Sequence, residues 1–85
     1  MSDEEFRRQA LTHLDALHNL AVYLTRNGSE AEDLVQETYV RAFAALEGFR
    51  GEASLRTWLT RITINEARER LRRRKRQTLP LDQVD

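Results

Sequence analysis

The chain has 85 residues, of which 40% are apolar and 33% are charged, and it contains no cysteine. This length suits one small domain, and the lack of cysteine excludes a disulfide framework or a thiolate metal site. No apolar run is long enough to cross a bilayer, and the acidic N-terminus lacks the apolar stretch of a secretory signal. We therefore expect a cytoplasmic domain with no membrane insertion.

The formal net charge is zero, but the charges are segregated along the chain. Residues 1–54 hold five basic and ten acidic residues, a net charge of −5. Residues 55–76 hold nine basic and two acidic residues, a net charge of +7. The basic segment favours a polyanion as partner, whereas the acidic body favours a second, basic partner.

Apolar residues spaced three and four apart predict a first amphipathic helix over about residues 5–26. Asn27-Gly28 is a plausible left-handed stop, and Ser29 with Glu32 has the spacing of a capping box that begins a second helix. The second helix is expected to continue to about Leu46. Its predicted inward stripe consists of Ala31, Leu34, Val35, Thr38, Ala42, Phe43 and Leu46.

Two glycines mark a loop over residues 47–53, and Ser54 is placed to cap a third helix that begins at Leu55. The apolar face of this helix consists of Leu55, Trp58, Leu59 and Ile62, followed by Ile64, Ala67 and Leu71. Nothing apolar follows until Leu79, so the basic end is expected to project or fray, and the helix to stop within residues 77–80. No segment alternates with the period of a strand. The sequence predicts an all-α fold, a compact bundle of three main helices whose third helix is long and basic.

Catalysis is not expected. His13 and His18 are five residues apart, whereas two metal ligands on one helix face need a spacing of three or four. The carboxylates of Glu30, Glu32 and Asp33 are better explained by the first turn of a helix, where the helix dipole favours acids. No glycine-rich phosphate loop is present. We therefore predict no enzymatic activity, no catalytic residue, no cofactor and no metal site.

The basic helix is the stronger functional signal. Its arginines can bind phosphates through a bidentate fork and stack on bases, and some of the following can share one solvent face: Arg56, Arg61, Arg68 and Arg72. The amide of Asn65 can pair with the edge of a base. Trp58 and Phe49 add aromatic surface near this charge. Composition alone leaves two interpretations open, a nucleic-acid surface or core aromatics beside a solvated basic face.

Three segments carry a family resemblance: Glu32-Asp-Leu-Val-Gln-Glu-Thr-Tyr-Val-Arg-Ala-Phe43, Gly48-Phe-Arg-Gly-Glu-Ala53 and Leu55-Arg-Thr-Trp-Leu-Thr-Arg-Ile-Thr-Ile-Asn65. In this order and spacing they resemble region 2 of bacterial sigma factors, most closely the extracytoplasmic-function (ECF) class. The resemblance extends over about residues 10–76. It implies a transcription initiation module that binds core RNA polymerase and reads the −10 promoter element as partly melted DNA.

The resemblance assigns a polymerase-binding role to the start of the second helix. The matching residues, which in the family grip the clamp helices of the β′ subunit, are Asp33, Leu34, Gln36 and Glu37. Asp33, Gln36 and Glu37 lie three or four residues apart, which suits a basic partner. Without the resemblance, they would be interpreted as a solvated acidic face.

The resemblance also implies capture of a flipped base from the non-template strand. The loop segment Gly48–Ala53 and the helix start match the part of the family that holds this base, through Phe49, Arg50, Gly51 and Ser54. Asn65 matches a contact to the extruded base or its neighbour. Arg61, Arg68 and Arg72 would meet phosphates. Trp58 lies within the motif and is expected to be at least partly core.

Residues 1–76 are thus expected to form the region 2 domain, and residues 77–85 to begin an interdomain linker. Sigma factors of this class continue into region 4, which binds the −35 element. Region 4 is absent from this chain, so we expect a fragment. Two alternatives stay open: a protein-interaction module sequestered mainly by an anti-sigma factor, which the family commonly has, and a helical nucleic-acid binder without sequence preference.

Overall fold

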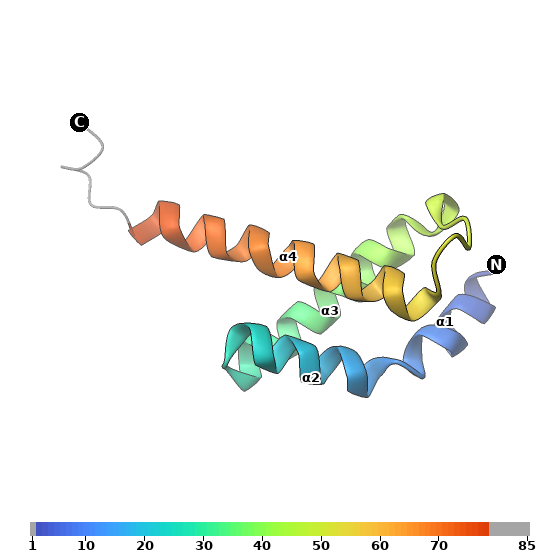
Figure 1. Cartoon of the computed structure of the whole chain (residues 1–85), viewed down its shortest axis with the longest axis horizontal. Helices are drawn as coiled ribbons and strands as arrows, with labels where there is room; N and C mark the ends of the chain where they lie inside the picture. The colour runs from blue at the N-terminus through green and yellow to red at the C-terminus, as the bar shows by residue number, and fades with distance from the viewer. Residues whose placement is uncertain (1, 79–85) are drawn as a thin grey trace.

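The computed structural model describes residues 2–78, and all structural statements below refer to them. They form α1 (Asp3–Leu11), α2 (Leu14–Thr25), α3 (Gly28–Ala44), the short 3₁₀ turn η1 (Leu46–Gly48) and α4 (Leu55–Thr78). Helices α2, α3 and α4 pack against one another, and α1 contacts α3 and α4 (Figure 1). These residues contain no strand, so the predicted all-α fold is confirmed.

The predicted first helix, residues 5–26, is instead two helices. Ser2 Oγ accepts a hydrogen bond from Glu5 N at 3.1 Å and caps α1. The chain leaves the helix after Leu11, where Thr12 Oγ1 donates to Gln9 O at 2.6 Å. The apolar periodicity did not reveal this break, because it continues through the two turn residues. The chain bends here so that α1 can pack on α3 and α4 while α2 follows α3.

The start of α3 also differs from the prediction. Arg26, rather than Asn27 or Gly28, takes the left-handed conformation, with φ of 56°. Asn27 is the N-cap, because its side-chain oxygen accepts the Glu30 amide at 3.0 Å. The capping box predicted from Ser29 is therefore wrong. Asparagine caps helices as well as serine does, and here it stands two residues earlier in the chain.

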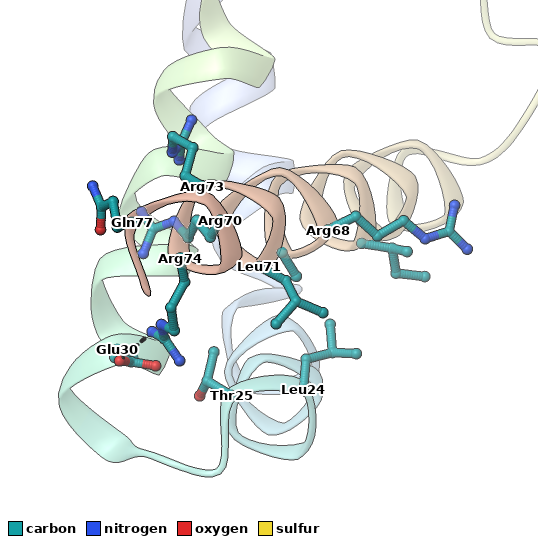
Figure 2. Close-up of a pocket in the computed structure, with 11 residues that line it drawn as sticks. Leu24, Thr25, Glu30, Arg68, Arg70, Leu71, Arg73, Arg74 and Gln77 are labelled. Atoms are coloured by element: carbon teal, nitrogen blue, oxygen red, sulfur yellow. Dashed lines mark hydrogen bonds and ion pairs between the residues drawn. The ribbon is translucent and has the colours of Figure 1, made fainter. Parts of the chain in front are cut away.

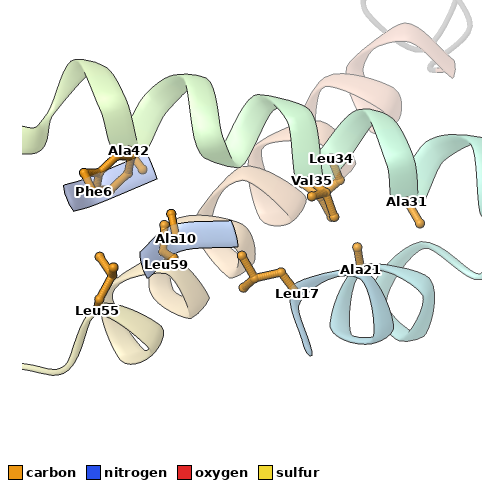
Figure 3. Close-up of a cluster of buried hydrophobic side chains, with 10 residues drawn as sticks. All are labelled: Phe6, Ala10, Leu17, Ala21, Ala31, Leu34, Val35, Ala42, Leu55 and Leu59. Carbon is orange, nitrogen blue, oxygen red and sulfur yellow. The ribbon is translucent and has the colours of Figure 1, made fainter. Parts of the chain in front are cut away.

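The core lies where α3 and α4 cross, closed by α1 and α2 (Figure 3). Its ten buried apolar side chains are Phe6, Ala10, Leu17, Ala21, Ala31, Leu34, Val35, Ala42, Leu55 and Leu59. The predicted inward stripe of α3 is confirmed from Ala31 to Ala42. It is wrong at its end, because Phe43 is 39% exposed. Leu46 lies beyond α3, in η1, and is only partly buried.

Two buried threonines mark the crossing of α3 and α4. Thr38 Oγ1 lies 2.8 Å from Leu34 O, and Thr63 Oγ1 lies 2.9 Å from Leu59 O. The two hydroxyl oxygens are 3.2 Å apart. Each hydroxyl thus finds its partners inside the core, which lets two polar side chains be buried without an unsatisfied group.

Tyr39 ties α3 to the end of α1. Its hydroxyl donates to Ala10 O at 2.8 Å. Burial raises the pKa of Tyr39 above its ordinary value of 10.0, because the phenolate form would lose hydration.

The basic end of α4 was expected to project or fray. It projects past α2 in Figure 1, but it remains helical to Thr78. Arg74 donates to Glu30 Oε1 at 2.6 Å and so links this end of α4 to the first turn of α3. Gln77 and Thr78 therefore belong to α4, and the rest of the predicted linker, residues 79–85, lies outside the described residues. Of the helices described here, none has the length and apolar content to pass through a membrane.

Candidate functional site

Four polar side chains of α4 form one exposed row, which we call the outer face. They recur at intervals of four, three and four residues, and 3.6 residues per turn places such positions on one side of a helix. The outer face consists of Arg61, Asn65, Arg68 and Arg72, all exposed. Leu55, Leu59 and Thr63 fill the buried side. The fold therefore brings together four of the predicted DNA-binding residues.

Asn65 has a free amide. It is exposed and makes no hydrogen bond within residues 2–78. It borders a hollow of about 550 Å³ whose other lining residues include Arg41, Ile62 and Arg73. A scaffold asparagine would be bonded to the backbone that it supports. The amide of Asn65 instead keeps its donors and its acceptor available, as a contact to a base edge requires.

Arg56 does not belong to the outer face. It is exposed, but it precedes Arg61 by five residues, which corresponds to a rotation of about 140° around the helix. Of the four arginines that were considered for one solvent face, Arg56 is therefore the one that helical spacing places elsewhere.

The two aromatic candidates lie at the edge of the core. The rings of Phe49 and Trp58 are 4.9 Å apart at an angle of 37°. Trp58 also meets Phe6 edge to face, at 6.5 Å and 81°. Both side chains are half-buried. Trp58 is therefore partly core, as predicted, and each ring has only its uncovered surface left for a base.

In the loop before α4, Arg50 and Gly51 are open to solvent, whereas the hydroxyl of Ser54 is hydrogen-bonded within the protein. Arg50 and Gly51 are exposed, and Gly51 has a φ of 73°, which favours glycine. A side chain at Gly51 would meet no atom within 4 Å, so the space next to it is open. Ser54 Oγ accepts the Thr57 amide at 3.1 Å, which confirms it as the cap of α4. That hydroxyl is thus already engaged.

The loop and Asn65 are well separated along α4. Asn65 comes ten residues after Leu55, about 15 Å along the helix axis. The start of α4 and Asn65 are thus separated by nearly three turns of the helix.

The predicted polymerase-binding residues of α3 do not all reach the surface. Asp33 and Gln36 are exposed, and Glu37 is partly exposed and bonded to Arg41 Nε at 3.0 Å. Leu34 is 0% exposed and belongs to the core, so its side chain cannot touch a partner. The family resemblance had implied a contact for Leu34, whereas the predicted inward stripe had placed it in the core, and the structure agrees with the stripe.

Val40 extends the exposed surface of α3 and was not among the predicted site residues. It is 61% exposed and lies one helical turn beyond Gln36 and Glu37, on the same face of α3. The available signal was its position outside the apolar stripe of the helix. We call Asp33, Gln36, Glu37 and Val40 the α3 face.

Comparison with known proteins decides the family. Residues 10–77 match the family described as sigma-70 region 2. The chain belongs to the sigma-70 region 2 family. The ECF RNA polymerase sigma factor SigG of Mycobacterium tuberculosis is 46% identical over 77 residues, which cover 91% of this chain and 19% of that protein. The factor SigM of the same species is 37% identical over 83 residues, which cover 96% of this chain and 40% of that protein.

A third relative lies outside that genus. The ECF RNA polymerase sigma-E factor of Haemophilus influenzae is 42% identical over 52 residues, which cover 61% of this chain and 26% of that protein. The relatives support the ECF class that the motifs had suggested. This region 2 domain spans less than half the length of each of them.

A buried carboxylate joins α3 to α4 in this region 2 domain. The side chain of Glu66 is 3% exposed and faces three arginines. Its oxygens lie 3.0 Å from Arg41 Nε, 3.2 Å from Arg70 Nε and 3.3 Å from Arg73 Nη2. Sequence reasoning missed this residue, because a glutamate within an arginine-rich helix resembles an ordinary surface partner.

A second hollow, of about 590 Å³, lies between the last turns of α4 and the junction of α2 with α3 (Figure 2). Its apolar part includes Leu24 and Leu71, which are 38% and 52% exposed. Arginines line much of the remainder: Arg68, Arg70, Arg73 and Arg74. An apolar floor with a cationic rim suits an acidic, amphipathic segment of another protein. Over residues 2–78, no cluster of three or more His, Asp or Glu side chains is arranged to hold a metal ion.

Proposed function

We propose that this region 2 domain acts in transcription initiation, in the cytoplasm, by binding alone. The α3 face binds the clamp helices of the β′ subunit of core RNA polymerase. The loop before α4 and the outer face bind the non-template strand of the −10 promoter element. The observation that carries the proposal is that the fold gathers Arg61, Asn65 and Arg68 on one solvent face of a helix from a family of transcription factors.

The chemistry of the two surfaces supports different partners. The outer face offers fixed positive charge for phosphates and one free amide for a base edge. The α3 face offers the carboxylates of Asp33 and Glu37, with the exposed Val40 at one end, which suits a basic surface that also has an apolar contact. A protein with both surfaces can hold melted DNA against a polymerase.

Capture of a base offsets the cost of unpairing. A base that leaves the stack loses a few kcal/mol of stacking and pairing energy. Contacts between the base and the loop, and between phosphates and arginines, form only when the strand is open, and their favourable energy offsets this cost. The open space beside Gly51 leaves room for the approach of a nucleotide.

Fluorescence anisotropy with core polymerase tests the DNA half of the proposal. We expect a single-stranded non-template −10 oligonucleotide to bind more tightly than the matching duplex. Equal or tighter binding of the duplex would contradict base capture. Binding that is equally tight for every single-stranded sequence would support the alternative of a helical binder without sequence preference.

A charge reversal tests the polymerase half. Asp33→Arg places a like charge opposite a basic partner, so the affinity for a peptide of the β′ clamp helices should fall at least tenfold, about 1.4 kcal/mol or more. Asp15→Arg makes the same change in net charge at an exposed position of α2, outside the α3 face, and should have little effect. Equal losses for the two variants would remove Asp33 from the proposed contact.

The hollow beside Leu24 and Leu71 favours a second candidate partner, an anti-sigma factor with an acidic amphipathic helix. Leu71→Glu should weaken such a complex by placing a charge on the apolar floor. Loss of that complex with unchanged binding of clamp helices and DNA would assign the hollow to the anti-sigma factor, and an unchanged complex would remove the hollow from this contact.

A further inference from the structure

The arginines of α4 fall into two groups. On the outer face, Arg61 and Arg68 have no ion-pair partner in the described part of the chain, and Arg72 forms an exposed pair with Glu69 at 3.3 Å. Arg70, Arg73 and Arg74 are instead turned toward oxygen atoms of Glu66, Asp33 and Glu30. Arg70 lies 3.2 Å from Glu66 and donates to Asp33 O at 3.3 Å. Arg73 lies 3.3 Å from Glu66, and Arg74 lies 2.6 Å from Glu30. Figure 2 shows Arg68 on the opposite side of the helix from Arg70, and Arg74 extended toward Glu30.

We propose that Glu66 and Glu30 determine specificity by acting as internal anions. They occupy Arg70, Arg73 and Arg74 in the place of DNA phosphates. This inference rests on the proposed DNA-binding function and adds to it a role for two acidic residues that touch no nucleotide.

The physical reason is that a phosphate contact adds affinity without sequence information. Carboxylate and phosphate both present two oxygens to the guanidinium fork, so they compete for the same arginine. Each arginine released to the solvent adds a contact that every DNA sequence satisfies equally. Such contacts strengthen non-specific binding and lower the ratio of specific to non-specific affinity.

Glu66 is the stronger of the two internal anions. Its carboxylate is almost fully buried, and salt screens a buried pair much less than an exposed one. The pair of Glu30 and Arg74 is more exposed, with 37% and 56% of the side chains accessible, so salt weakens it. Loss of the Glu66 charge should therefore release more positive charge than loss of the Glu30 charge.

One of the released arginines, Arg73, would lie close to the proposed DNA site. Arg73, Glu66 and Asn65 line the same hollow of about 550 Å³. An Arg73 side chain without its carboxylate could turn toward a phosphate beside Asn65. Arg41 would stay neutralised, because Glu37 also lies 3.0 Å from its Nε.

Glu66→Gln and Glu30→Gln test the inference against Glu32→Gln. Glu32 is exposed, lies in the same turn as Glu30 and makes no ion pair in the described part of the chain, so its variant changes the net charge equally and releases no arginine. Circular dichroism establishes that each variant is folded. Affinity for a random-sequence duplex and elution from heparin are then measured over a range of salt concentrations.

We expect the plot of log affinity against log salt to steepen by about one to two units for Glu66→Gln, and by about one unit for Glu30→Gln, relative to Glu32→Gln. Both variants should also leave heparin at higher salt than Glu32→Gln. Slopes and elution equal to those of Glu32→Gln would overturn the inference. If Glu66→Gln does not fold, Glu30→Gln decides, because its pair lies at the surface.

A selectivity measurement separates this inference from the proposed function. The preference of the wild-type protein for the single-stranded −10 sequence over random duplex should fall several-fold in Glu66→Gln. A wild-type protein without that preference would refute the proposed function, while the heparin comparison would still decide whether Glu66 and Glu30 act as internal anions. A preserved preference in a folded Glu66→Gln would overturn the inference alone.

Discussion

The two groups of arginines on α4 have the same chemistry and different surroundings. Arg68 on the outer face has no partner in the described part of the chain, whereas Arg70, two residues later, contacts Glu66 and Asp33 O. Both arginines belong to one basic run, in which the sequence does not distinguish them. The difference arises from the direction in which each side chain leaves the helix. Charge in the sequence therefore indicates how much positive surface is available, and the fold decides which part of it is free.

The largest expected difference between the two sides of α4 concerns the stability of the fold. Leu59 is 0% exposed, and Leu59→Ala leaves a cavity, so the free energy of unfolding should fall by about 2–5 kcal/mol. Arg68→Ala, on the outer face, should change stability by no more than about 0.5 kcal/mol. Denaturant unfolding measures both. Similar losses for the two variants would mean that α4 is not anchored as described.

On the outer face, substitutions of Asn65 and Arg72 should have different effects, the first on base preference and the second on overall affinity for DNA. Asn65→Ala should cost about 1–3 kcal/mol against the preferred base and little against other bases, because an amide distinguishes base edges. Arg72→Ala should weaken binding equally for all bases, because every nucleotide presents the same phosphate.

Binding measured with all four bases at the position that Asn65 contacts decides between these roles. A uniform loss in Asn65→Ala, together with impaired folding, would assign Asn65 to the scaffold. Specificity would then depend on the loop before α4 alone.

Arg68 provides a smaller and more general test. Arg68→Ala should flatten the salt dependence of single-strand binding by about 0.7 units for one lost phosphate contact. Arg8→Ala removes the same charge from the exposed side of α1, far along the chain from α4, and is the control. If the two variants give the same slope, Arg68 contributes only net charge.

The smallest expected effect concerns Tyr39, outside α4. The pKa of Tyr39 is raised in the folded state by burial, so its stabilising contribution is complete below about pH 10 and is lost as the pH rises through the folded-state value. The stability of the wild-type protein should therefore fall above about pH 10, and that of Tyr39→Phe should fall less. Thermal unfolding at pH 8 to 11 measures the difference. Parallel curves would show that the pKa of Tyr39 does not differ between the folded and unfolded states.

Much of the region 2 fold could be predicted from the pattern of residues. The stripe from Ala31 to Ala42, the cap at Ser54 and the long basic helix are local features, and local spacing and side-chain chemistry determine them. The break after Leu11 could not be predicted in this way, because no glycine or proline marks it. Packing of α1 on α3 and α4 produces it.

The candidate site also has features that could be predicted from the sequence and features that could not. The sequence by itself determined the residue types and their order, and with them the helical spacing that places Arg61, Asn65 and Arg68 together. Only the tertiary structure decided that Phe43 is 39% exposed and that Glu66 is buried among three arginines. Spacing along a helix fixes which side chains share a face. Which face meets another helix depends on contacts between residues far apart in the chain, and the sequence does not display those contacts.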